Sequence, residues 1–110
     1  MRAYLIDEIS PDHMEKINDF LKKNGMPSNL DQIFWIKIPE DYLNETQSEH
    51  TNCQPHVFAV EIGSDWVKLE FFVRSHTKME CTCTRYCTTK QMSYVIKFAN
   101  GMIEKLGIAT

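Results

Sequence analysis

The sequence has few glycines and no long apolar run. Its 110 residues include 4 glycines, at positions 25, 63, 101 and 107. These are far apart, so the chain lacks the glycine-rich loop that cradles phosphates in nucleotide-binding proteins. No stretch approaches the roughly 18 apolar residues of a membrane-spanning helix. The motifs H-E-x-x-H and G-x-S-x-G are also missing, which excludes the enzyme classes that carry them.

Basic side chains are outnumbered by acidic ones. The chain has 12 basic and 15 acidic side chains, a formal net charge of -3 and a pI near 5.8. Binding to nucleic-acid phosphates requires many clustered cations, and the sequence has no run of Lys or Arg. The beginning of the chain, residues 1–7, is too short and too soon charged for a signal peptide. We therefore expect a cytoplasmic protein with neither nucleic acid nor membrane as a partner.

The composition that remains is that of a folded domain. Hydrophobic residues make up 43% and charged residues 25% of the chain, which are values close to the averages for soluble domains. A chain of this length is sufficient for one core and too short for two. We therefore treat residues 1–110 as a single domain.

Two helices are predicted from their capping residues. Ser10-Pro11 supplies an N-cap and first position for a helix that Gly25 closes. Thr88 and Gln91 have the spacing of a capping box, and an apolar stripe with helical period follows them as far as Gly107. A shorter helical turn is expected near residues 44–50, where a second capping-box spacing occurs.

Five strands are predicted from runs of apolar or alternating residues. They cover residues 3–9, 33–38, 57–62, 66–75 and 79–84. Gly63-Ser64-Asp65 forms the turn of a hairpin between the third and fourth of them. The order β-α-β-β-β-β-α predicts an α+β fold, with a mainly antiparallel sheet of about five strands and two helices on one face.

A group of metal-ligating residue types is the candidate site. His50 and Cys53 are three residues apart, which places both side chains on one side of a helical turn. Cys81 and Cys83 are two apart, which on a strand places both sulfurs on one face. Zinc prefers four such nitrogen and sulfur donors in tetrahedral geometry. We therefore predict a structural zinc site at His50, Cys53, Cys81 and Cys83, and a binding or scaffolding role for the domain.

Other assignments of these residues stay open at this point. Cys87 is a fifth candidate ligand, and His56 and His76 are close in sequence. Unpaired cysteines are also common core residues. In that case the protein would be a plain interaction module without metal.

A third alternative is thiol chemistry, which would make the protein a thiol-dependent enzyme or redox protein. Cys87 precedes the last helix and Arg85 is two residues before it, so the helix dipole and the guanidinium are both expected to lower the pKa of the thiol. The same segment, with Arg85, Thr88 and Thr89, is also a candidate site for a small anion.

The outward face of the predicted hairpin is unusually aromatic. Trp66 and Phe72 lie among charged residues on the face that the helices leave open. A homodimer formed through this face would cover them. Residues 40–55 lying over the same aromatics are the alternative.

Overall fold

The structure is a computed structural model, and it describes residues 1–78 and 80–110. Within these ranges it contains seven strands, three α-helices and two short 3-10 helices. Their bounds are β1 Ala3–Ile6, α1 Pro11–Asn24, β2 Met26–Pro27, β3 Ile33–Lys37, η1 Glu40–Tyr42, α2 Glu45–Glu49, η2 Thr51–Cys53, β4 His56–Ile62, β5 Val67–Glu70, β6 Phe72–Ser75, β7 Arg85–Tyr86 and α3 Thr89–Leu106. The predicted α+β class is confirmed, the expected helical turn near residues 44–50 is α2, and the strands that were not predicted are the short β2 and β7.

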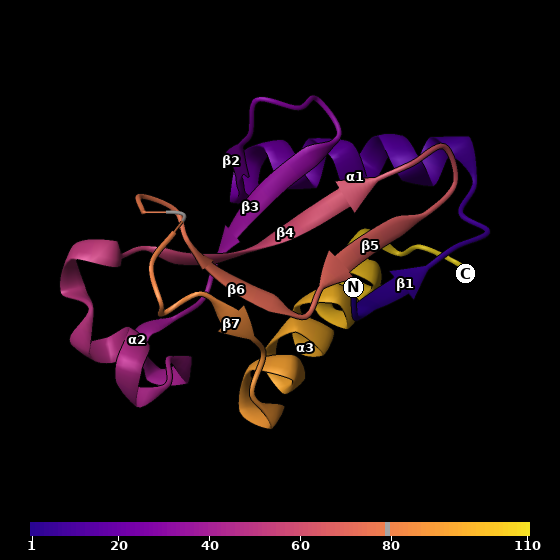
Figure 1. The fold of residues 1–110 in the computed structure, drawn as a ribbon. Helices are drawn as coiled ribbons and strands as arrows, with labels where there is room; N and C mark the ends of the chain where they lie inside the picture. The colour runs from indigo at the N-terminus through magenta and orange to yellow at the C-terminus, as the bar shows by residue number, and fades with distance from the viewer. Residues whose placement is uncertain (79) are drawn as a thin grey trace.

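All strand pairs in the sheet are antiparallel. The strand order is β1-β5-β4-β3-β2, and β6 pairs with β4 and with β7. Strand β4 is the centre of the sheet: along one edge its second half pairs with β5, and its beginning pairs with β6. Figure 1 shows β5 and β6 following one another along this edge of β4.

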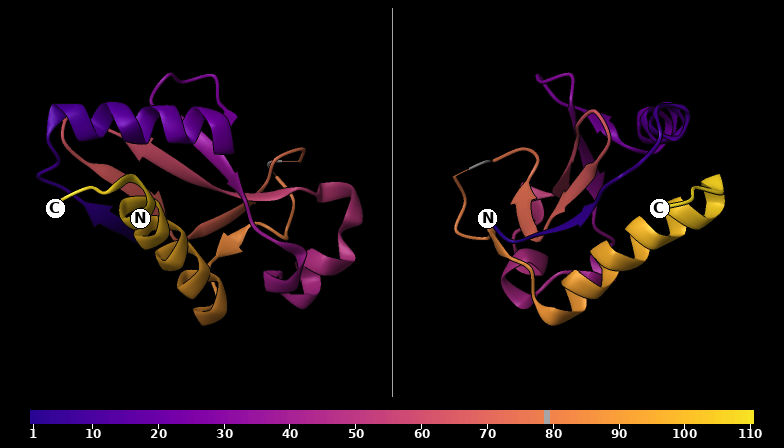
Figure 2. Two further views of the ribbon diagram at one scale, coloured as in Figure 1. Left: turned by 180° about the vertical axis from the view of Figure 1, so that it is seen from behind. Right: turned by 90° about the vertical axis from the view of Figure 1, so that its right-hand side faces the viewer.

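Helices α1 and α3 cover the same face of the sheet, as Figure 2 shows. Phe20 of α1 and Phe98 of α3 meet with ring centroids 6.1 Å apart, and Phe98 also packs edge-on against Phe58 of β4. Phe58 is fully buried. The helices therefore pack against the sheet through one shared core. Within the described ranges no helix has the length and apolar character needed to cross a membrane.

The predicted strand at 66–75 is broken at Phe71. The backbone N–H of Phe71 donates to the carbonyl of Arg2, and its carbonyl accepts from the N–H of Cys87. Phe71 is therefore the point where the chain leaves its pairing with β1 and begins its pairing with β7. Alternation of side chains continues on both sides of this bend, which is why the sequence pattern alone predicts one strand.

The strand predicted at 79–84 is wrong for the described residues 80–84. Met79 lies outside the described residues. The backbone bonds here are local: the N–H of Cys81 donates to the carbonyl of Lys78, and the N–H of Thr84 donates to the carbonyl of Cys81. Bonds over three residues define turns rather than a strand ladder. The sulfurs of Cys81 and Cys83 are therefore brought to one side by a turn and not by the pleat of a strand.

The two helix-ending glycines have different physical roles. Gly107 has φ 65°, the left-handed conformation of a helix C-cap. Gly25 has an extended backbone, and a Cβ built there would lie 2.9 Å from Ile36 Cδ1. A side chain at position 25 would therefore be crowded by β3 and by the carbonyl of Leu21, which would lie 3.0 Å from the same Cβ. Gly101, inside α3, has nothing within 4 Å of such a Cβ, so close packing does not explain it.

Candidate metal centre

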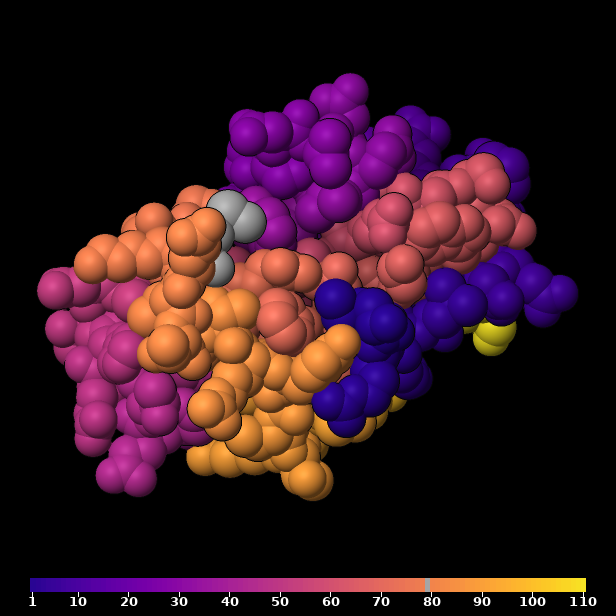
Figure 3. Space-filling view, viewed as in Figure 1, coloured from indigo at the N-terminus to yellow at the C-terminus, as the bar shows by residue number. Residues whose placement is uncertain are grey.

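Four side chains from two distant segments meet at one end of the sheet. They are His50, Cys53, Cys81 and Cys83, and one ligand atom from each lies within 4.8 Å of all the others. Figure 3 shows the two segments that carry them, magenta and orange, in contact at this end of the molecule. Cys53 and Cys83 are buried, whereas His50 and Cys81 are half-buried. The group therefore has a closed inner side and an outer side near the surface.

His50 and Cys53 are held by two short helices. Asn44 caps α2, and together with Gln47 it forms the predicted capping box. His50 ends α2, and the carbonyl of His50 accepts a hydrogen bond from the N–H of Cys53 at 2.9 Å. This tight turn places the imidazole and the thiol on one side, as the spacing of three residues predicts.

The distances suit a single tetrahedral ion. His50 Nδ1 lies 3.0 Å from Cys81 Sγ and 3.9 Å from Cys53 Sγ. A tetrahedral ion with bonds of 2.0–2.3 Å keeps its ligand atoms roughly 3.5–3.8 Å apart. The 3.0 Å separation is about 0.5 Å below this range and the largest in the group is about 1 Å above it, so small rotations of the side chains would bring the four atoms to tetrahedral positions. One nitrogen and three sulfurs are soft ligands, so the group can hold a transition-metal ion.

A serine ties the turn after β6 to the backbone of Cys53. The hydroxyl of the buried Ser75 donates to the carbonyl of Cys53, and it accepts hydrogen bonds from the N–H groups of Thr77 and Lys78. Thr77 Oγ1 adds a bond to the carbonyl of Asn52. These bonds fix the segment that leads to Cys81 against the segment that carries Cys53.

Two buried glutamines tie the other side of the group to the two helix starts. Gln47 Nε2 donates to the carbonyl of Cys83 at 3.0 Å, and Gln91 Nε2 donates to Gln47 Oε1 at 2.8 Å. Both glutamines are fully buried. Gln47 and Gln91 also occupy the N3 positions of α2 and α3, where each completes the capping box of its helix. The chain of bonds from Cys83 through Gln47 to Gln91 therefore links the candidate centre to the long C-terminal helix.

The thiols of the group differ in acidity. The N–H of Cys83 donates to the sulfur of Cys81, and this bond, with further hydrogen bonds from Cys53, Cys83 and His50, lowers the pKa of Cys81 to about 6. Burial raises the pKa of Cys83 to about 12, because the thiolate loses its hydration. The lowered pKa favours the thiolate form of Cys81 at neutral pH.

Alkylation of the metal-free protein is expected to begin at Cys81. At pH 7 this thiol is mostly ionised and half-exposed, whereas burial raises the pKa of Cys87 to about 11. Iodoacetamide should modify Cys81 at least tenfold faster than Cys87, with a rate that falls as the pH drops through about 6. Peptide mapping of briefly treated protein measures this, and preferred labelling of Cys87 would contradict it.

The pKa of Cys87 is raised to about 11, opposite to the direction that its place in the sequence predicts. The sulfur is partly buried, and this desolvation outweighs the opposing effect of the Arg2 charge on its pKa. Cys87 is also not a member of the group that converges on His50. Proximity to a helix start and to Arg85 in sequence predicts a lowered pKa only where the thiol stays solvated.

At the predicted anion site near α3, some of the backbone N–H donors already form hydrogen bonds within the helix cap. Thr88 Oγ1 accepts from the N–H of Gln91, and Gln91 Oε1 accepts from the N–H of Thr88. Arg85, Thr88 and Thr89 are exposed. The capping box therefore uses two of the N–H groups that an anion would need, and anion binding here stays a prediction.

His56 lies next to the candidate centre, and the spacing of the cysteines in the sequence does not predict this position. It is the first residue of β4, it is 1% exposed, and its Nε2 lies 3.4 Å from Cys83 Sγ. Burial, followed by the nearby His50, lowers its pKa. The available signal was the alternation of β4, which places His56 on the core side with Phe58 and Val60.

The aromatics on the open face of the sheet have partners within the chain. Trp66 covers Gly63, where a Cβ would lie 2.1 Å from the indole ring. Phe72 meets Tyr86 edge-on at 4.9 Å, and the Arg74 guanidinium lies 4.6 Å from the Phe72 ring. Trp66 and Phe72 are half-buried. The homodimer predicted through them stays a prediction.

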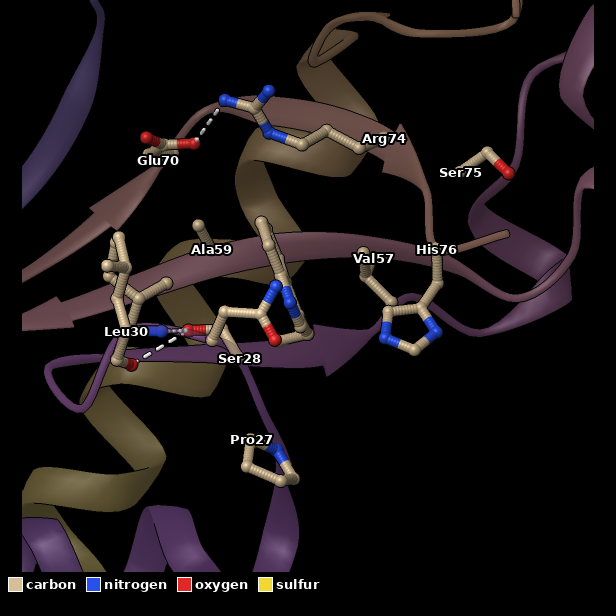
Figure 4. Close-up of a pocket in the computed structure, with 12 residues that line it drawn as sticks. Pro27, Ser28, Leu30, Val57, Ala59, Glu70, Arg74, Ser75 and His76 are labelled. Atoms are coloured by element: carbon tan, nitrogen blue, oxygen red, sulfur yellow. Dashed lines mark hydrogen bonds and ion pairs between the residues drawn. The ribbon is translucent and has the colours of Figure 1, made fainter. Parts of the chain in front are cut away.

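A groove of about 570 Å³ lies on the open face beside these residues. Figure 4 shows it between the loop after β2, the first half of β4 and the end of β6. The Glu70–Arg74 ion pair, with a distance of 3.1 Å, forms one wall, and Val57 and Ala59 lie in its floor. None of the four residues of the cysteine group lines the groove, but Ser75, which does, also donates a hydrogen bond to the carbonyl of Cys53.

Comparison with known proteins gives no relative. No protein-family model, curated protein or solved structure matches the chain.

Proposed function

We propose that this protein is a small metal-binding domain that holds one structural zinc ion through His50, Cys53, Cys81 and Cys83. The observation that carries the proposal is the convergence of these four ligand atoms within 4.8 Å. The pair His50 and Cys53 is about thirty residues from the pair Cys81 and Cys83 in the sequence. Their meeting in space is therefore produced by the fold and not by proximity along the chain. Both residue types in the group, histidine and cysteine, are standard zinc ligands.

The donor set favours zinc over other common ions. Magnesium and calcium prefer oxygen ligands, and the group offers one nitrogen and three sulfurs. Four protein ligands close a tetrahedral shell, so no position is left for a substrate or for an activated water. This supports a structural role, in which the ion joins the segment at 50–53 to the turn at 81–83.

A structural ion here suits a binding or scaffolding role for the domain. The two joined segments contribute few strand bonds of their own, and the buried groups between them are largely polar. Metal ligation adds a crosslink that exists only in the folded state. The alternative without metal leaves Cys53 and Cys83 as ordinary buried thiols.

Zinc content tests the proposal. The purified protein should contain one zinc ion per chain by elemental analysis. Cys81→Ser should contain well below one, and the partial exposure of Cys81 limits the damage of this change to the core. Cys87→Ser is the matched control and should keep full zinc content, because Cys87 lies outside the group. Wild-type protein that takes up no zinc from a zinc-buffered solution would overturn the proposal.

A further inference from the structure

We infer that His56 is a positioning residue for the metal centre, which donates a hydrogen bond from Nε2 to the sulfur of Cys83; this rests on the metal site proposed above. The two atoms are 3.4 Å apart. His56 is not one of the four groups that lie mutually within 4.8 Å. Its contact with Cys83 therefore places it next to the ligand shell without making it a ligand.

Among the described residues, Cys83 is the one hydrogen-bond contact of the His56 side chain. His56 lies on the core side of β4, and its side chain is among the largest that are fully buried. Within the described part of the chain, Nδ1 has no hydrogen-bond partner. A buried imidazole in a row of apolar side chains is unfavourable unless it is hydrogen-bonded. The contact with Cys83 Sγ is what explains a histidine at this position.

The direction of the hydrogen bond follows from the chemistry of a bound thiolate. A cysteine that ligates zinc has lost its proton, so its sulfur can accept a hydrogen bond and cannot donate one. Nε2 must then carry the hydrogen. Three thiolates and one neutral imidazole around Zn²⁺ leave a net charge of about -1. Cys83 is 0% exposed, so an N–H donor at its sulfur stabilises charge that water cannot reach.

Zinc affinity of His56 variants tests this role. His56→Phe should still bind one zinc ion per chain, but about 10- to 100-fold more weakly in competition with a chelating dye, as is typical when a hydrogen-bond partner of a ligand is removed. His56→Gln keeps an N–H donor and should recover part of the loss. Val60→Ala, a buried change on the same strand, is the packing control and should leave the affinity within a few-fold of the wild type.

Cobalt spectra separate a hydrogen-bonding role from ligation. Cobalt-loaded His56→Phe should keep the strong visible bands of a tetrahedral site, while its sulfur-to-cobalt charge-transfer band shifts because one sulfur has lost a donor. Unchanged affinity and an unchanged charge-transfer band would overturn the inference and leave the metal site intact. Loss of the tetrahedral bands would also overturn it, because His56 would then be a ligand. A wild-type protein that binds no metal would reject both proposals.

A second pair of variants covers the case in which His56→Phe does not fold. His56→Leu and His56→Gln are both smaller than Phe, and only Gln can donate to sulfur. The inference predicts the tighter zinc binding for Gln. Equal affinities for the two would contradict it.

Discussion

Removal of the metal is expected to lower the melting temperature by roughly 15 °C or more. A ligand present at 1,000 times its Kd stabilises the folded state by about 4 kcal/mol, and each kcal/mol corresponds to about 4–8 °C in a domain of this size. The effect does not extend to complete unfolding, because the apolar core between the sheet and helices α1 and α3 contains none of the four ligands. Thermal melts before and after treatment with a strong chelator measure the shift.

Local measurements and a control variant make this prediction specific. Hydrogen exchange after chelation should accelerate at residues 50–56 and 80–86 before it does so in α1 or α3, since the proposed ion would join the former segments and not the helices. Addition of zinc should restore the melting temperature of Cys87→Ser and should not raise that of Cys81→Ser. A melting temperature that does not respond to chelation of zinc-containing protein would show that the ion is not structural.

Replacement of Gln91 by alanine is expected to destabilise the protein by about 3 kcal/mol. Gln91 Nε2 donates to the carbonyl of Tyr42 at 2.9 Å and to Gln47 Oε1 at 2.8 Å. Its Oε1 accepts from the N–H of Thr88. The change removes all three bonds within a fully buried site, and each buried group left without a partner costs about 1–3 kcal/mol. Urea denaturation measures the difference.

Two further variants separate the causes of this effect. Gln91→Met keeps most of the volume and loses the hydrogen bonds, so it should retain most of the destabilisation. Gln32→Ala changes an exposed glutamine and should stay within about 0.5 kcal/mol of the wild type. The double replacement of Gln47 and Gln91 should cost less than the sum of the single ones, because the two share a bond. Additive costs, or a neutral Gln91→Ala, would contradict the network.

Local signals in the sequence predicted the helices and most of the sheet. The capping residues Ser10, Asn44 and Thr88 all occupy the predicted N-cap positions, because capping depends on groups within one turn of the chain. The break at Phe71 was not predictable in this way. It depends on Arg2 and Cys87, which are distant in sequence and satisfy the backbone at the bend.

In the candidate site, too, the local turn was predictable and the contacts between distant segments were not. The spacing of His50 and Cys53 reports a local turn, and the structure contains that turn. The assignment of Cys81 and Cys83 to a strand was wrong, although a turn brings their sulfurs to the same point. The roles of His56 and of the two glutamines were out of reach, because each depends on a contact across 27 or more positions in the chain. Periodicity carries no information on such contacts.

X-ray absorption at the zinc edge of the purified protein tests the central claim most directly. Convergence of His50, Cys53, Cys81 and Cys83 on one ion predicts three sulfur neighbours at about 2.3 Å and one nitrogen neighbour at about 2.0 Å. Cys81→Ser should reduce the sulfur count, and Cys87→Ser should leave the spectrum unchanged. A wild-type spectrum dominated by oxygen and nitrogen neighbours, with fewer than two sulfurs, would show that the cysteines do not form a metal centre.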